Sequence, residues 1–146
     1  MKKVTLSSWL SVMMLASVAC VANVYAGAVL DTPPAAVNTS DRYIFFMHGK
    51  IVEKKGLPAR SKRYGDYQYK AMLRALADEG FTVISEARAR GTYVYDYAVK
   101  VAAQVNDLLG KGVPARNITV SGFSKGGRMT AMISSLLEND EINYVI

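Results

Sequence analysis

The stretch "SGFSKGG", residues 121–127, constrains the fold of this chain more than any other segment. It places Gly122 and Gly126 on either side of Ser124, the G-x-S-x-G spacing that presents a serine on a tight turn between a strand and a helix. Glycine suits both positions because a side chain would collide where the strand reverses into the helix. The β-branched run before the turn and the helical spacing after it predict a strand over 117–123 and a helix over 125–139.

Two other interpretations of this turn stay open on the residues alone. The glycines could simply permit a tight turn in which Ser124 caps the following helix, as serines often do. A phosphate-binding loop is a weaker alternative, because neither G-x-x-x-x-G-K-[ST] nor G-x-G-x-x-G is present.

The rest of the chain alternates apolar runs with segments of helical spacing. The runs predict strands over 42–49, 81–87, 117–123 and 142–146, and the helical spacing predicts helices over 64–80, 92–112 and 125–139. Gly56 and Pro58 interrupt the polar segment 51–63, which we expect to be a loop. The alternation predicts an α/β fold, a parallel sheet with flanking helices, in one domain over 42–146. The prolines and small polar residues of 27–41 predict an extended leader.

The N-terminus has the layout of a secretory signal peptide. Lys2 and Lys3 precede an apolar run, and small or short residues at 24 and 26 form a cleavage signal, so we expect a signal peptide over 1–26. Lipid attachment at Cys20 is an alternative. The mature chain is then exported to the periplasm or secreted, lacks cysteine, and has no later segment near the ~20 apolar residues of a stable membrane span.

The charge of the chain excludes some classes of partner. The whole chain carries a net charge of +6, and the basic residues of the mature part are scattered instead of forming a dense stripe with interleaved aromatics. We therefore expect no nucleic-acid partner. The sequence holds no constellation typical of a metal site, and we expect no cofactor.

Three features follow predicted strands, at the sheet edge where α/β proteins bind ligands. Ser124 follows the strand over 117–123, His48 and Gly49 end the apolar run 42–49 just after its strand residues 42–47, and Arg88 and Arg90 follow the strand over 81–87. The two arginines are candidates for holding an anionic substrate group, with ordinary surface charges as the alternative. The nearby tyrosines, at 64, 67, 69, 93, 95 and 97, are expected to pack between helices.

The segments "IFFMHGK" and "ITVSGFSKGGRM" together resemble the α/β-hydrolase fold, in which an HG motif ends one strand and a nucleophile elbow ends a later one. The resemblance covers 42–146 and corresponds to the N-terminal part of such a domain. It implies that Ser124 is a nucleophile and that the backbone N–H groups of Lys125 and Lys50 form an oxyanion hole. His48, with Gly49, would support the oxyanion loop.

The catalytic triad of this fold runs Ser, then Asp or Glu, then His, and no histidine follows Ser124. The acids after Ser124 are expected at the opposite end of the sheet from the turn. They are Glu138, Asp140 and Glu141.

We therefore expect the sheet to be cut off after the 125–139 helix, within the strand over 142–146, with the acid and the histidine beyond it. The chain would be part of an exported serine hydrolase that acts on an ester, thioester or amide through an acyl-enzyme, and it would be inactive as 146 residues. The alternative is a non-catalytic remnant or binding domain, whose exposed edge at 142–146 invites a partner strand or a missing C-terminal half.

Overall fold

The structure, a computed structural model, describes residues 27–146. The predicted signal peptide and the Cys20 alternative fall on residues 1–26, outside the described part of the chain.

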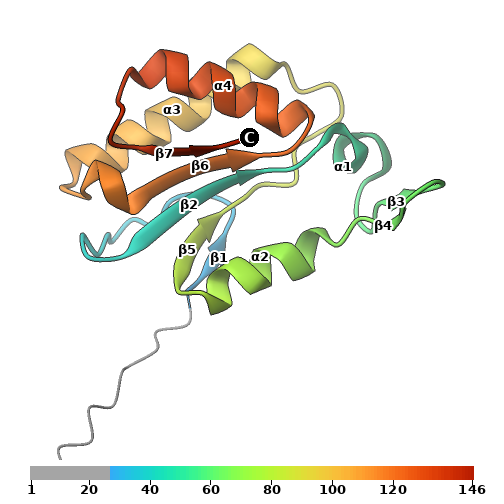
Figure 1. The fold of residues 1–146 in the computed structure, drawn as a ribbon, viewed down its shortest axis with the longest axis horizontal. Helices are drawn as coiled ribbons and strands as arrows, with labels where there is room; N and C mark the ends of the chain where they lie inside the picture. Colours follow the sequence, from blue (N-terminus) through green and yellow to red (C-terminus); the bar gives the residue numbers. More distant parts are fainter. Residues whose placement is uncertain (1–26) are drawn as a thin grey trace, which may run out of the picture.

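A parallel sheet forms the centre of the molecule (Figure 1). Its strands lie in the order β1-β5-β2-β6-β7, and every neighbouring pair is parallel. Their bounds are β1 (Val29–Leu30), β2 (Arg42–Met47), β5 (Phe81–Ile84), β6 (Ile118–Gly122) and β7 (Asn143–Val145). This arrangement confirms the α/β prediction of a parallel sheet with flanking helices.

Helices cover both faces of the sheet (Figure 1). On one face α2 (Tyr69–Asp78) packs through Tyr69 and Leu73 on Ile44 and Val83. On the other face α3 (Val94–Gly110) and α4 (Lys125–Leu137) enclose a larger core. Successive side chains of β2 point to opposite faces, so Ile44 joins the first core while its neighbours join the second.

The prediction for the segment 51–63 is wrong. The segment 51–63, expected to be a loop, contains the short helix α1 (Lys50–Lys55) and the strand β3 (Arg60–Ser61), which pairs with β4 (Gly65–Asp66) in an antiparallel hairpin. As a result α2 begins at Tyr69 and not at residue 64. The predicted leader supplies β1, because its backbone pairs with β5 over two residues. Elements this short carry no readable periodicity.

The order of the strands makes the chain leave the neighbouring strands β2 and β6 in opposite directions. The chain leaves β2 toward β5 on one side, and it leaves β6 toward β7 on the other, although β2 and β6 are neighbours. The loops that follow these two strands therefore turn to opposite faces of the sheet. In open α/β sheets this switch point, at the carboxyl ends of the strands, is where ligands bind.

The turn after β6 rests directly on the end of β2. A Cβ atom added to Gly126 would lie 1.9 Å from the backbone oxygen of Met47, and one added to Gly122 would lie 2.4 Å from the carbonyl carbon of Gly126. The Phe123 N–H donates to the same Met47 oxygen at 3.2 Å. Only glycine permits backbone atoms to approach this closely, so the two glycines of the motif fix how the turn sits on the sheet.

We predict that Gly126→Ala lowers the free energy of unfolding by about 1–3 kcal/mol or more, because overpacking against backbone cannot relax cheaply. Gly110→Ala is the matched control. Gly110 lies in α3 with open space around its Cα, so alanine there should stabilise by about 0.5–1 kcal/mol. Urea unfolding of both variants checks the prediction, and equal stability of the two would contradict it.

Candidate functional site

Ser124 occupies the apex of the turn in a strained conformation. Its φ is 57° and its ψ is −113°, a region that non-glycine residues rarely adopt at a cost of about 1–3 kcal/mol. The residue is exposed and its side chain makes no capping hydrogen bond to α4. The geometry therefore does not fit the alternative in which Ser124 simply caps the helix, since the hydroxyl is left free at the surface.

His48 and Gly49, which follow β2 and which we call the HG loop, lie beside this serine. A Cβ atom on Gly49 would be 3.7 Å from the Cβ of Ser124 and 3.5 Å from the backbone oxygen of Phe123. Lys50 is the first residue of α1 and Lys125 the first of α4, so neither backbone N–H has an intrahelical acceptor. Within residues 27–146 no hydrogen bond is made by either group. Two unsatisfied donors thus flank the serine on neighbouring segments.

A cavity of about 480 Å³ opens at Ser124, and we call it the serine cavity. It lies between the HG loop, the β3–β4 hairpin and the turn itself, and its volume is that of a small-molecule site. Its lining is Gly49, Lys50, Ile51, Ser61, Tyr64, Gly65, Asp66, Tyr67, Phe123 and Ser124.

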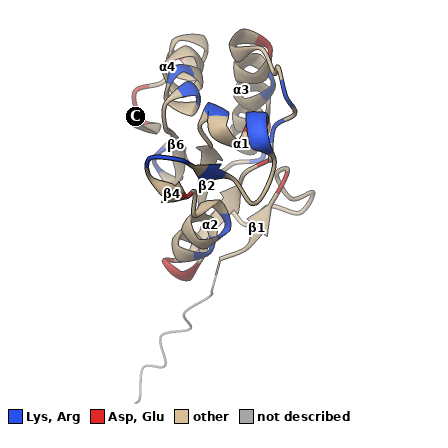
Figure 2. Cartoon of the chain, turned by 90° about the vertical axis from the view of Figure 1, so that its right-hand side faces the viewer, with Lys and Arg blue, Asp and Glu red and all other residues tan. Residues whose placement is uncertain are grey.

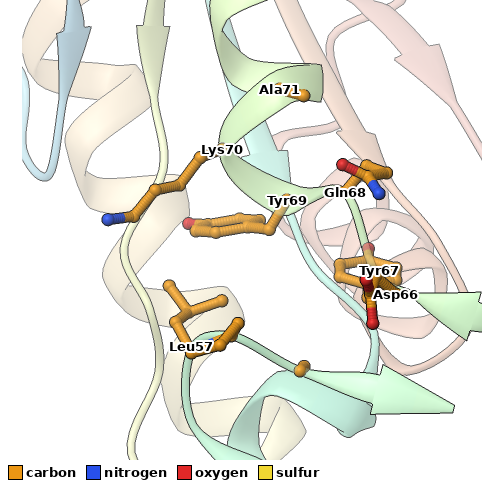
Figure 3. A pocket seen from close by; sticks show the side chains of 9 residues that line it. Leu57, Asp66, Tyr67, Gln68, Tyr69, Lys70 and Ala71 are labelled. Atoms are coloured by element: carbon orange, nitrogen blue, oxygen red, sulfur yellow. The ribbon is translucent and has the colours of Figure 1, made fainter.

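A second cavity of about 320 Å³ lies by the start of α2, between Leu57 and Tyr69 (Figure 3). The Tyr69 hydroxyl is committed to a hydrogen bond with the Ser85 hydroxyl, 2.7 Å away. Ser124 does not line this cavity, so the serine cavity is the better candidate site.

His48 is fully buried, and both of its ring nitrogens are engaged. Nε2 accepts a hydrogen bond from the Arg88 N–H at 2.9 Å, which leaves Nδ1–H to donate to the Gly49 oxygen at 2.8 Å. Burial is the main cause that lowers its pKa, and the nearby Arg88 charge lowers it further. The imidazole is therefore neutral and fixed in one tautomer, with no free nitrogen to act as a base for Ser124, and it fastens the HG loop to the segment after β5.

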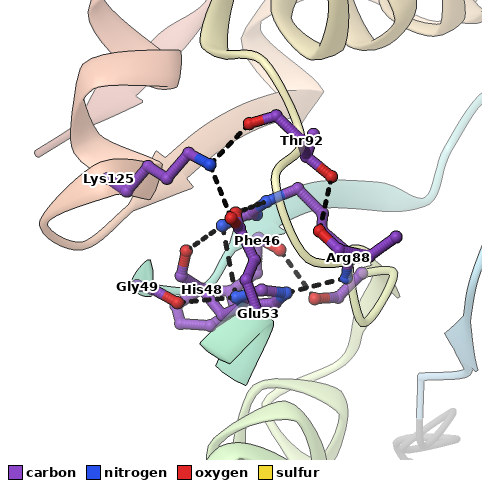
Figure 4. A network of polar contacts seen from close by, with 9 residues as sticks. Phe46, His48, Gly49, Glu53, Arg88, Thr92 and Lys125 are labelled. Atoms are coloured by element: carbon purple, nitrogen blue, oxygen red, sulfur yellow. Dashed lines mark hydrogen bonds and ion pairs between the residues drawn. The ribbon is translucent and has the colours of Figure 1, made fainter. Parts of the chain in front are cut away.

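Glu53 of α1 joins three segments through one buried carboxylate (Figure 4). Oε1 accepts from the Arg88 Nε at 3.0 Å, and Oε2 accepts from the Lys125 Nζ at 2.5 Å. Lys125 also donates to the backbone oxygen of Thr92, and Arg88 to that of His48. The side chains of Glu53 and Arg88 are 2% and 0% exposed. The turn, the HG loop and the 88–92 loop are thereby held together from inside.

The protonation of Glu53 follows from this network. Burial raises the pKa of its carboxyl, but the hydrogen bonds and positive charges of Lys125 and Arg88 outweigh burial and hold the pKa below its ordinary value. Glu53 is ionised at neutral pH.

Arg88 does not fit the substrate-binding role expected for it. Its guanidinium is buried against Glu53 and His48, with the Tyr97 ring 5.1 Å away, because the β5 end turns it inward. Arg90 is exposed, but it does not line the serine cavity. Neither arginine therefore offers its charge to a ligand beside Ser124.

Sequence reasoning missed two parts of the site. Glu53 lies in the segment expected to be a loop, and nothing in the sequence marks it beyond being an acid among lysines. Tyr64 and Tyr67 were expected to pack between helices, but they precede α2 and line the serine cavity, with Tyr64 77% exposed. Two further tyrosines of that set, Tyr93 and Tyr95, are also exposed, while Tyr69 is buried as predicted.

Comparison of the chain with models of known protein families and with curated proteins gives no match. Across residues 27–146, no helix is long and apolar enough to cross a membrane. The same residues contain no cluster of three or more His, Cys, Asp or Glu side chains that could hold a metal ion.

We predict that Glu53→Gln lowers the free energy of unfolding by about 3–5 kcal/mol at neutral pH, because it leaves the buried Arg88 and the partly buried Lys125 without their counter-charge. The pKa of Glu53 is lowered on folding, so its contribution is present at neutral pH and is lost as the pH falls through that lowered pKa. The difference in the free energy of unfolding between the wild type and Glu53→Gln should therefore become smaller in acid.

Glu86→Gln is the matched control, since Glu86 pairs with Lys100 at the surface and such pairs contribute about 0–1 kcal/mol. Urea unfolding over a range of pH measures all three proteins. A Glu53→Gln variant no less stable than Glu86→Gln would contradict the prediction.

Proposed function

We propose that this chain carries the nucleophile and oxyanion hole of a serine hydrolase of the α/β-hydrolase type, acting on an ester, thioester or amide. The observation that carries the proposal is the conformation of Ser124. Its backbone is strained, its hydroxyl does not cap α4, and it lies at a cavity with the HG loop packed beside it. A conformation this costly at an exposed serine has a ready explanation if its hydroxyl must be presented to a substrate.

In the proposed reaction the Ser124 hydroxyl attacks the substrate carbonyl and forms a tetrahedral oxyanion. The backbone N–H groups of Lys125 and Lys50, which have no other partner among residues 27–146, donate to that oxyanion. Each such fixed donor typically contributes about 3 kcal/mol to lowering the barrier. Loss of the alcohol, thiol or amine then leaves an acyl-enzyme, which water hydrolyses.

The reaction needs a base that accepts the Ser124 proton, and His48 does not supply it. His48 is the single histidine of the sequence, and its two nitrogens are engaged in buried hydrogen bonds. Glu53 is committed to Lys125 and Arg88. The proposed reaction therefore needs a base other than His48 and Glu53, and Ser124 remains a protonated, slow nucleophile without it.

The Glu53 network supports the proposal through the positions of the two donors. Lys125 carries one donor in its backbone while its ammonium binds Glu53. The other donor, on Lys50, begins the helix to which Glu53 belongs. One carboxylate thus restrains both N–H groups, and donors fixed before the reaction cost no reorganisation when charge develops.

The second candidate is a non-catalytic binding domain that keeps this scaffold. The commitment of its one histidine to the HG loop favours it, and so does the exposed edge at β7, where Val145 is 54% exposed. Such a domain would bind a ligand or a partner strand without reacting with it.

A fluorophosphonate probe separates the two candidates, applied to the protein as isolated from cells that express its gene. We expect one adduct, located on the Ser124 peptide by mass spectrometry, and its complete loss in Ser124→Ala. Ser135→Ala, an exposed serine on α4, is the control and should label like the wild type. Equal labelling of Ser124→Ala would show that Ser124 is not the nucleophile, and no labelling of any serine would favour the binding domain.

A further inference from the structure

We propose that the substrate is an amphipathic anion, whose apolar acyl or aryl part lies in the serine cavity and whose negative group lies on the basic side of the β3–β4 hairpin. That this ligand is a substrate rests on the proposed hydrolase function. The chemical class of the ligand rests on the two faces of the hairpin, which are independent of the reaction.

The first face is apolar and aromatic. Ile51, Tyr64, Tyr67 and Phe123 are the large apolar and aromatic residues that line the cavity around Ser124, and the charged residues of the same lining are Lys50 and Asp66. Phe123 is 66% exposed and Tyr64 77% exposed, although both are large rings beside a cavity. Burying the exposed surface of these rings against an apolar ligand would be favourable in free energy. The part of the ligand next to Ser124 should therefore be apolar or aromatic.

The second face is basic. A hollow of about 390 Å³, which we call the basic hollow, lies next to the serine cavity and shares Ser61 and Gly65 of the hairpin with it. Its other lining residues are Lys55, Arg60 and Lys62. Figure 2 shows basic residues on α1 and on the chain beside β4, as well as on other elements such as α4. A ligand that extends from Ser124 past Gly65 therefore meets positive charge.

Little negative charge opposes these cations. The one acid of the segment 50–63 is Glu53, which is buried and bound to Lys125 and Arg88. Asp66, which also lines the serine cavity, faces Arg60 at 3.6 Å and offsets one of the three positive charges that line the basic hollow. The hollow thus keeps a net positive potential, which favours and attracts an anionic group.

Three ligands of the same shape and different charge test the proposal on the full protein. They are phenylbutyrate, phenylbutanol and phenylbutylamine, with binding followed by calorimetry. We expect the carboxylate to bind about fivefold more tightly than the alcohol, the amine to bind most weakly, and the differences to shrink at high salt. Equal affinities for the three would overturn the proposal.

Charge reversal locates the anion. Lys62→Glu should abolish the preference for phenylbutyrate while leaving phenylbutanol unchanged. Arg116→Glu is the matched control, an exposed residue at the opposite end of the sheet before β6, and it should keep the preference. Phe123→Ala should weaken all three ligands together, because Phe123 contributes apolar wall and no charge. A preference that survives Lys62→Glu and falls in Arg116→Glu would place the anion elsewhere and contradict the proposal.

The same titration on Ser124→Ala separates this inference from the hydrolase proposal. Selective binding of phenylbutyrate to Ser124→Ala, with no probe labelling of the wild type, would support the anion site and count against the hydrolase. Labelling of Ser124 together with equal affinities for the three ligands would support the hydrolase and contradict the anion site. Binding to phosphatidylglycerol vesicles but not to phenylbutyrate would assign the basic surface to a membrane and also overturn the inference.

Discussion

The candidate site depends on one close approach between two backbones. Gly126 lies so near the end of β2 that an added Cβ atom would sit 1.9 Å from the Met47 oxygen. This contact fixes the turn after β6 against the loop after β2, and Ser124 takes its strained conformation within that turn. The strand order makes the contact, since β2 and β6 are neighbours whose following loops diverge. The cavity at Ser124 is a consequence of that divergence.

Glu53 secures the same junction by charge. A buried carboxylate bound to two cations is expensive to desolvate, and replacing such a group by apolar residues is often neutral or stabilising. Burial of Glu53 and Arg88 is therefore poorly explained by stability alone. It is better explained by geometry, because Glu53 holds together the turn that carries Ser124, the HG loop and the 88–92 loop.

The parts of the fold that were predictable from sequence are those set by local pattern. The strand, the turn at Ser124 and the helix after it follow from glycine spacing and periodicity over adjacent residues. The α1 helix and the β3–β4 hairpin were not predictable, because six-residue and two-residue elements show no period. The pairing of Glu53 with Lys125 joins positions 72 residues apart, and only the sheet topology brings them together. The inward turn of Arg88 was missed for the same reason.

Native-state hydrogen exchange tests most directly whether this junction is held rigid. The amide of Phe123 donates to Met47, and that of Arg88 donates to the buried His48 ring. If the junction is one preorganised unit, both amides should exchange only through global unfolding, at the rate of the core amides of β6. Exchange of either amide orders of magnitude faster than that core would show that the turn and the HG loop open locally, and it would contradict the account.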